Sequence, residues 1–90
     1  MYPENIIKGI ELKNQDIINR IYKTYFGSIH IMIKKNHGTK EESKDVFQEA
    51  MIIIYKRIKD KGLNLTCSFK TYIYSICYNL WLNEINKKKN

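Results

Sequence analysis

The segment from Thr39 to Gly62 constrains the fold of this chain most, because it carries the signals of one long helix. Thr39 and Glu42 form a Thr-x-x-Glu capping box, which is typical of a helix N-terminus, and Gly62 is a stop signal. Apolar residues then repeat at helical spacing on one side, at Val46, Ala50, Ile54 and Ile58. We expect a helix over residues 39–60 whose inward face is this stripe.

The second half of this helix is apolar on more than its inward side. Met51, Ile52 and Tyr55 lie beside or outside the stripe, next to acidic and amide residues. A surface helix of a small domain normally shows one apolar stripe and one polar face. Exposed apolar area beside a polar strip therefore indicates a docking surface for another protein.

Three further helices are predicted, over residues 4–12, 14–35 and 68–87. Asn14 is a good N-cap, Asp16 lies in the first turn after it, and Ser68 can cap the last helix. No segment alternates at period two over a useful length, so strands are not expected. The fold class is therefore all-α: a compact helical bundle of three main antiparallel helices plus a short N-terminal helix, in a single domain spanning residues 1–90.

The expected core is made of one face from each long helix. Helical spacing assigns to it Ile18, Tyr22, Tyr25, Phe47, Ala50, Ile54, Ile58, Phe69, Ile73, Ile76 and Leu80. Cys77 also falls on an apolar helix face and is expected to be a small buried thiol. The last predicted helix also carries three aromatic residues away from its apolar stripe, at spacings of four and three: Tyr74, Tyr78 and Trp81. That placement suits base stacking, although Trp81 has packing against the first long helix as an alternative.

The composition narrows the possible functions. The net charge of +7 is uneven, with a balance of +2 over residues 1–45 and +5 over residues 46–90. Such a cationic excess indicates a polyanion partner, or simply the lysine-rich composition that an AT-rich genome gives. The two cysteines and two histidines form no metal or catalytic set, so we expect no enzyme, no metal and no cofactor. The absence of a signal peptide and of a long apolar run predicts a cytoplasmic protein that does not insert into membranes.

Three segments carry a resemblance to a known family. Residues 21–26, IYKTYF, are similar to an "LY..YF" segment; residues 42–51, ESKDVFQEAM, are similar to "EEAEDVxQExF"; residues 69–79, FKTYIYSICYN, are similar to "FxTWLxxIARN". In this order and spacing the chain resembles domain two of bacterial sigma factors of the sigma-70 superfamily, of the extracytoplasmic-function type. The resemblance extends from about Leu12 to Lys89.

The resemblance implies two sets of site residues. The third helix would dock on the coiled-coil clamp helices of the largest RNA polymerase subunit through Asp45, Gln48, Glu49, Ile52 and Lys56. The loop over residues 61–68 and the fourth helix would capture the non-template strand of the minus-ten promoter element. The DNA-binding residues implied are Lys59, Lys61, Asn64, Lys70, Tyr74, Tyr78, Asn79, Asn83 and Lys87. An anti-sigma factor is a further partner that the family implies.

The chain departs from the family pattern at several positions. Tyr78 stands where the family usually has Arg, Asn83 where Asp is common, Asn86 where Arg is common, and Tyr72 where Trp is usual. The family's second helical domain, which binds the upstream promoter element, is also absent from this chain. Two alternatives therefore stay open: a helical regulator that reads duplex DNA, and a polymerase-interaction module that does not open DNA.

Overall fold

The computed structural model describes residues 3–88, with side chains over residues 5–88. This part consists of four helices and no strand: α1 (Pro3–Glu11), α2 (Gln15–Lys35), α3 (Lys40–Lys61) and α4 (Phe69–Lys88). Each helix begins and ends within one residue of its expected range. The all-α fold class is confirmed.

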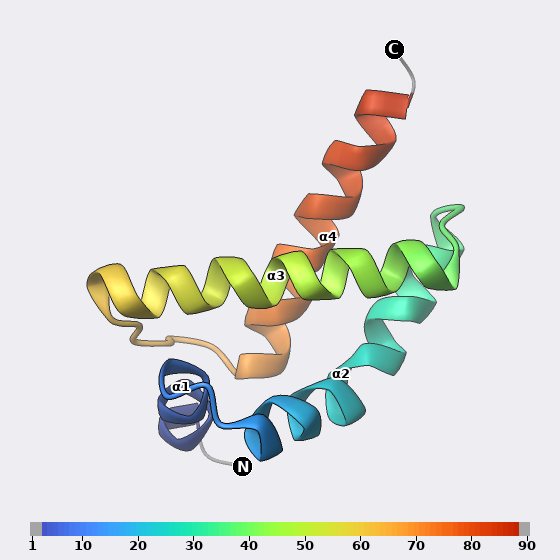
Figure 1. Ribbon diagram of the computed structural model, residues 1–90. Helices are drawn as coiled ribbons and strands as arrows, with labels where there is room; N and C mark the ends of the chain where they lie inside the picture. Colours follow the sequence, from blue (N-terminus) through green and yellow to red (C-terminus); the bar gives the residue numbers. More distant parts are fainter. Residues whose placement is uncertain (1–2, 89–90) are drawn as a thin grey trace.

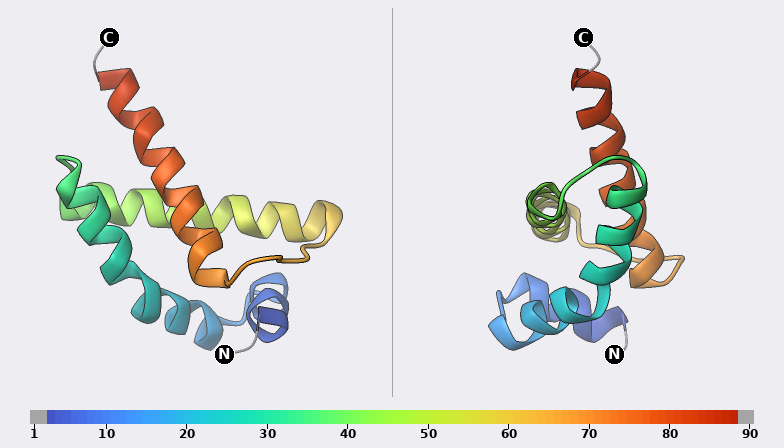
Figure 2. Two further views of the ribbon diagram at one scale, coloured as in Figure 1. Left: turned by 180° about the vertical axis from the view of Figure 1, so that it is seen from behind. Right: turned by 90° about the vertical axis from the view of Figure 1, so that its right-hand side faces the viewer.

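The helices form two layers (Figure 1). The long helix α3 makes one layer, and α2 and α4 cross behind it, as the side view of Figure 2 shows. The crossing of α3 and α4 is steep, so α4 contacts α3 near the middle of both helices and then projects beyond the other helices toward the C-terminus. The short helix α1 lies at the opposite end, next to the start of α2.

Local capping explains why the helices end where they do. The Asn14 side chain accepts hydrogen bonds from the backbone N–H groups of Asp16 and Ile17 at 3.0 and 3.3 Å. The capping box at Thr39 is complete: its hydroxyl accepts from the Glu42 N–H at 3.1 Å, and the Glu42 carboxylate accepts from the Thr39 N–H at 3.0 Å. Gly62 ends α3 at a φ of 70°, a conformation that glycine adopts without steric cost.

The rotation of α2 about its axis differs from the expectation. Its buried residues are Ile21, Phe26, Ile29, Met32 and Ile33. The predicted core positions Ile18 and Tyr25 are half-buried, and Tyr22 is 38% exposed, so the prediction was wrong for Tyr22. A buried tyrosine needs a partner for its hydroxyl, whereas phenylalanine does not. Phe26 takes the inner position, and Tyr22 stacks on its outer side with the ring centroids 4.6 Å apart.

The buried stripe of α4 is also rotated by about one residue. Phe69, Ile73, Cys77 and Trp81 are buried at four-residue spacing, while the predicted Ile76 and Leu80 are half-buried. Of the two alternatives left open for Trp81, the structure shows packing: the ring is buried against the end of α2 and does not face outward with the tyrosines. Its indole N–H donates to the Asn36 carbonyl at the end of α2, at 3.1 Å, so burial leaves no polar atom of the ring without a partner.

Cys77 is a buried thiol, as expected. Burial raises its pKa from 9.0 to about 12, because the apolar surroundings disfavour the thiolate.

Candidate functional site

The exposed face of α3 brings the five predicted docking residues together. Asp45, Gln48, Glu49, Ile52 and Lys56 are all exposed, on the side of the helix opposite to its buried residues. Ile52 keeps 54% of its surface accessible, which is unusual for a large apolar side chain. Along the helix the carboxylates come first, Ile52 follows, and Lys56 comes last. We call this set the α3 strip.

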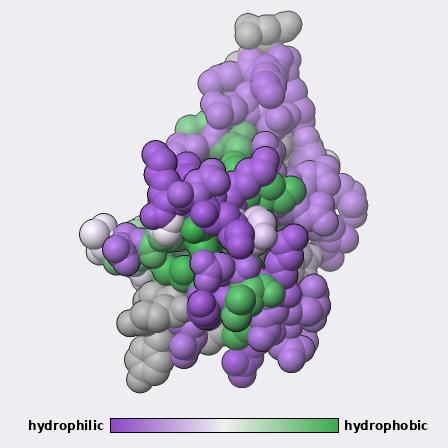
Figure 3. Space-filling model, turned by 60° about the vertical axis from the view of Figure 1, so that its left-hand side comes forward, coloured by the Kyte–Doolittle hydropathy of each residue, from purple (hydrophilic) through white to green (hydrophobic). Residues whose placement is uncertain are grey.

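The apolar residues beside the strip differ in exposure. Met51 and Tyr55 are half-buried and pack against the hydrophobic core. The Lys13 ammonium lies 4.9 Å from the centre of the Tyr55 ring. Figure 3 shows that apolar side chains on this side of the molecule form separate patches bordered by hydrophilic ones.

The loop between α3 and α4 is held against the core and exposes polar side chains. Leu63 and Leu65 are half-buried against the core, whereas Asn64 between them is exposed. Across the loop, the Arg57 guanidinium donates to the Tyr72 hydroxyl at 2.9 Å and joins α3 to α4. Sequence reasoning missed this anchoring, although the alternation at residues 63–65 signals it.

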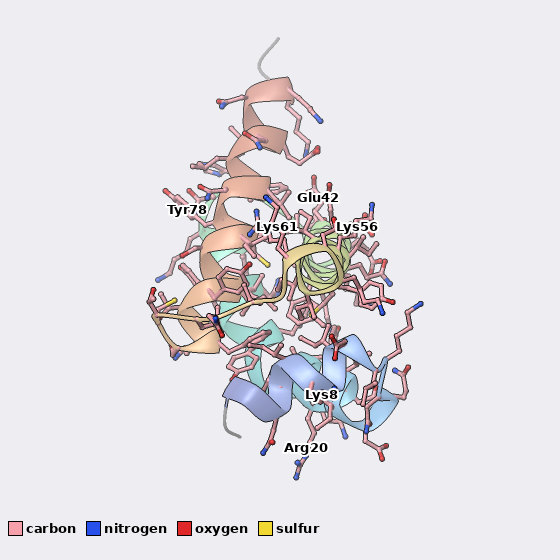
Figure 4. The ribbon with its side chains drawn as sticks, turned by 90° about the vertical axis from the view of Figure 1, so that its left-hand side faces the viewer. Lys8, Arg20, Glu42, Lys56, Lys61 and Tyr78 are labelled. Atoms are coloured by element: carbon pink, nitrogen blue, oxygen red, sulfur yellow. The ribbon has the colours of Figure 1, made fainter. Side chains whose placement is uncertain are left out.

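The cations predicted to contact DNA are exposed at both ends of this loop. Lys59 and Lys61 lie in the last turn of α3, and Lys70 lies in the first turn of α4. Figure 4 shows Lys61 on the side of α3 that faces α4. Lys87 is also exposed but lies far along α4, where its ammonium is 3.8 Å from the Glu84 carboxylate.

The outer side of α4 carries the predicted aromatic residues. Tyr74 and Tyr78 are 38% and 40% exposed, and with Ser75 and Asn79 they line a shallow depression. Asn83 is exposed one turn further along the helix. Exposed tyrosine rings beside amide groups can stack on bases and donate hydrogen bonds to them.

The two predicted faces lie on different sides of the molecule (Figure 4). Tyr78 projects from the side of α4 away from α3, and Lys56 projects from the side of α3 away from α4. The arrangement lets one partner occupy the α3 strip while another lies on α4.

Two ionisable groups outside these faces, His30 and Glu42, have structural partners. The His30 ring nitrogen Nδ1 lies 3.1 Å from the hydroxyl of buried Ser43, which donates to the Thr39 carbonyl at 3.0 Å. Glu42 pairs with Lys88, and this hydrogen bond, followed by the Thr39 backbone N–H, lowers the pKa of Glu42. Over residues 5–88 no three His, Cys, Asp or Glu side chains are grouped so that they could hold a metal ion. No helix in the described part of the chain is long and apolar enough to cross a membrane.

Comparisons with known proteins agree with the resemblance. The family model for sigma-70 region 2 matches residues 15–90. The chain is 32% identical over 83 residues to the ECF RNA polymerase sigma factor SigW of Bacillus subtilis (strain 168). That alignment covers 92% of this chain and 43% of the relative, so the chain spans less than half the length of the curated relative it matches. No solved structure matches the chain significantly.

Proposed function

Because the chain belongs to the sigma-70 superfamily, as a region 2 domain of the extracytoplasmic-function type, we propose that it docks on core RNA polymerase and holds the melted minus-ten element during transcription initiation. The observation that carries this proposal is the separation of the α3 strip from the aromatic face of α4 (Figure 4). A domain that joins polymerase to one DNA strand needs two such independent surfaces. This role belongs in the cytoplasm and needs no cofactor, because binding energy opens the strands.

The docking half of the proposal rests on the α3 strip. Its carboxylates, Asp45 and Glu49, lie one turn apart on a rigid helix, and Gln48 and Ile52 lie beside them. Carboxylates steer and orient a basic partner, and an exposed isoleucine adds apolar contact area. The proposed partner is the coiled-coil clamp helix pair of the largest polymerase subunit.

Charge reversal on the strip tests docking. Asp45→Lys or Glu49→Lys should weaken binding to core polymerase at least about tenfold, because each replaces attraction by repulsion. Asp60→Lys is the matched control, since it makes the same charge change on the same helix, one turn beyond the end of the strip and about three turns from Glu49. Circular dichroism should show equal helical content in all three. Unchanged affinity of the two strip variants would refute docking through this face.

The strand-capture half rests on aromatic rings beside cations. Tyr74 and Tyr78 offer stacking faces, Asn79 lies between them and Asn83, and Lys61 and Lys70 supply positive charge near the loop. Stacking contributes about 1–3 kcal/mol per base. The fourth helix is aromatic and poor in Arg and Gln, which disfavours the alternative of a recognition helix in a major groove.

A salt series separates stacking from charge. We expect single-stranded non-template minus-ten DNA to bind better than duplex, with a salt slope of about −2 to −3 for three or four phosphate contacts. Tyr78→Ala should lower affinity without changing the slope, and Lys61→Ala with Lys70→Ala should flatten the slope. Tyr22→Ala is the matched control, because Tyr22 is exposed to a similar extent on α2. Fluorescence anisotropy, with core polymerase supplied, measures all of these.

The same measurements distinguish the alternatives. Tight polymerase binding without strand preference would indicate an interaction module that does not open DNA. A preference for duplex over single strands would indicate a duplex-binding regulator. An anti-sigma factor, as a further partner of the family, would compete for one of the two faces.

A further inference from the structure

The guanidinium of Arg57 lies at the neck of the α3–α4 loop, and no carboxylate neutralises its charge. Its Nη1 group donates to the Tyr72 hydroxyl at 2.9 Å, and this bond joins the end of α3 to the first turn of α4. Within residues 5–88 the guanidinium makes no other hydrogen bond and forms no salt bridge. Most of its N–H groups are therefore free to bind a ligand.

Two lysines lie at the same neck. Lys61 follows Arg57 by one turn on the side of α3 that faces α4 (Figure 4), and Lys70 lies in the first turn of α4. All three cations are exposed, and none forms a salt bridge in the described part of the chain. By contrast, Lys87 at the far end of α4 pairs with Glu84. The neck therefore concentrates positive charge that the domain does not neutralise, which favours an anionic partner.

The hydroxyl of Tyr72 gives this arginine an orientation that the lysines lack. Tyr72 is half-buried and packs against the core, so its hydroxyl is a fixed acceptor that holds the planar guanidinium in place. A guanidinium held in this way can bind two phosphate oxygens at once and loses little side-chain entropy in doing so. Trp, which is usual in the family at this position, cannot accept such a hydrogen bond. The orientation therefore depends on the tyrosine that this chain has.

The side of α4 that carries Tyr72 leads to the predicted strand-binding residues. Tyr72, Ser75 and Asn79 follow spacings of three and four, so they lie on one side of the helix. Ser75 and Asn79 line the shallow depression together with Tyr74 and Tyr78. The distance along α4 from Tyr72 to Asn79 is about 10 Å. A strand that runs from the loop to this depression therefore passes the neck where the guanidinium lies.

We propose that Arg57, oriented by the Tyr72 hydroxyl, binds a backbone phosphate of the captured strand where that strand crosses from the loop to α4. The inference rests on the proposed function and adds to it a residue of α3 that contacts a phosphodiester group. The chain contains two arginines and α4 has none, since Tyr78 and Asn86 stand where the family usually has Arg. Arg57 supplies from α3 a guanidinium that α4 lacks.

A salt series with variants of Arg57 tests the proposal. With saturating core polymerase supplied, Arg57→Ala should weaken binding of single-stranded non-template minus-ten DNA about five- to tenfold and flatten the salt slope by about 0.7. Arg57→Lys should keep the slope and recover only part of the affinity, because lysine lacks the fork that binds two oxygens. Arg20→Ala is the matched control, since it removes the other arginine, which projects from α2 away from the neck (Figure 4). This control should bind like the parent chain.

Tyr72→Phe tests the orienting hydroxyl and keeps the ring. It should weaken strand binding about two- to threefold in the parent chain. It should have no further effect in the Arg57→Ala background, because the hydroxyl acts through the guanidinium. A pair that only anchors the loop would give a different result: Arg57→Ala would lower the urea midpoint of unfolding and leave the salt slope at the parent value. We expect equal unfolding midpoints, followed by circular dichroism, together with a changed slope.

Neutral methylphosphonate linkages in the DNA identify the phosphate. Each linkage of the strand is replaced in turn, and the loss of affinity is compared between the parent chain and Arg57→Ala. At one linkage the replacement should weaken binding of the parent chain at least about threefold more than binding of Arg57→Ala. Arg20→Ala should show the pattern of the parent chain. If no linkage shows such a difference, Arg57 does not contact the DNA backbone and the proposal is overturned.

The outcomes also separate this inference from the proposed function. If Tyr78→Ala weakens strand binding while Arg57→Ala keeps the affinity and the slope of the parent chain, strand capture by α4 stands and Arg57 takes no part in it. If the parent chain binds no single-stranded DNA even with core polymerase, the proposed function fails first and the inference falls with it.

Discussion

Replacement of Gly38 tests how α4 is fixed in the fold. This glycine follows α2 in the short connection to α3, where the Trp81 ring and Ile33 pack against it. A Cβ atom at position 38 would clash with Ile33 Cγ2 and would lie 2.7 and 2.9 Å from Trp81 Cζ2 and Cη2. Both neighbours are buried, so neither can move aside easily.

The expected cost of Gly38→Ala is about 1–3 kcal/mol of unfolding free energy, the range for an added methyl group in a packed core. Gly38 has no positive φ, so backbone strain makes no contribution. Gly27 is the matched control. It lies in the middle of α2 with no heavy atom within 4 Å of a Cβ built there. Gly27→Ala should therefore stabilise the domain by about 0.5–1 kcal/mol, because alanine is the better helix former.

Urea unfolding followed by circular dichroism measures both variants, and thermal unfolding should shift by about 4–8 °C for each kcal/mol. The cost of Gly38→Ala should shrink in a Trp81→Phe background, which lacks the two indole atoms that clash. It should not vanish, because the contact with Ile33 remains. If Gly38→Ala were as stabilising as Gly27→Ala, the packing of Trp81 on this connection would be refuted.

Two further predictions concern the ionisable groups. At pH 8 Cys67 should react rapidly with a thiol reagent, because it is exposed. Cys77 should not react until the chain unfolds, because burial shields it and raises its pKa to about 12. Equal reaction rates of the two thiols, measured by mass spectrometry, would contradict this. The raised pKa also means that the buried thiol stabilises the fold below pH 9, and that this contribution is lost as the pH rises from 9 toward 12. The lowered pKa of Glu42 means that its pairing with Lys88 stabilises the fold at neutral pH and is lost as the pH falls below 4.5. Glu42→Gln keeps the acceptor of the capping box and removes the charge, so its stability between pH 6 and 3, measured by urea titration, should fall less than that of the parent chain.

The helix ends could be predicted from sequence because capping is local. Asn14, Thr39 and Ser68 each bond to a backbone N–H group two or three residues away, so the signal and the structure lie in the same short segment. Exposure of the α3 strip was predictable for a related reason. The buried stripe of α3 is unambiguous, and the strip is the opposite side of the same helix.

The rotations of α2 and α4 could not be predicted in this way, because each helix offers two apolar stripes. On α4, Ile76 with Leu80 and Cys77 with Trp81 both fit a helical period. The choice depends on a distant partner, the Asn36 carbonyl that accepts the indole hydrogen bond, and on the space that Gly38 leaves for the ring.

The packing of Trp81 also determines what α4 presents to DNA. Tyr74 and Tyr78 each follow directly after a buried residue, Ile73 or Cys77, so they lie about 100° round the helix from the buried stripe. They keep this place only while the four-residue row from Phe69 to Trp81 stays against the core. At the far end of the row, Lys88 lies over the Trp81 ring and pairs with Glu42 of the α3 capping box. A change at Gly38 or Trp81 that turned α4 would therefore move the tyrosine face without touching it, while the strip would stay on the backbone of α3. The two faces should therefore be separable by mutation. A variant in which α4 has turned should lose its preference for single-stranded DNA and keep its binding to polymerase.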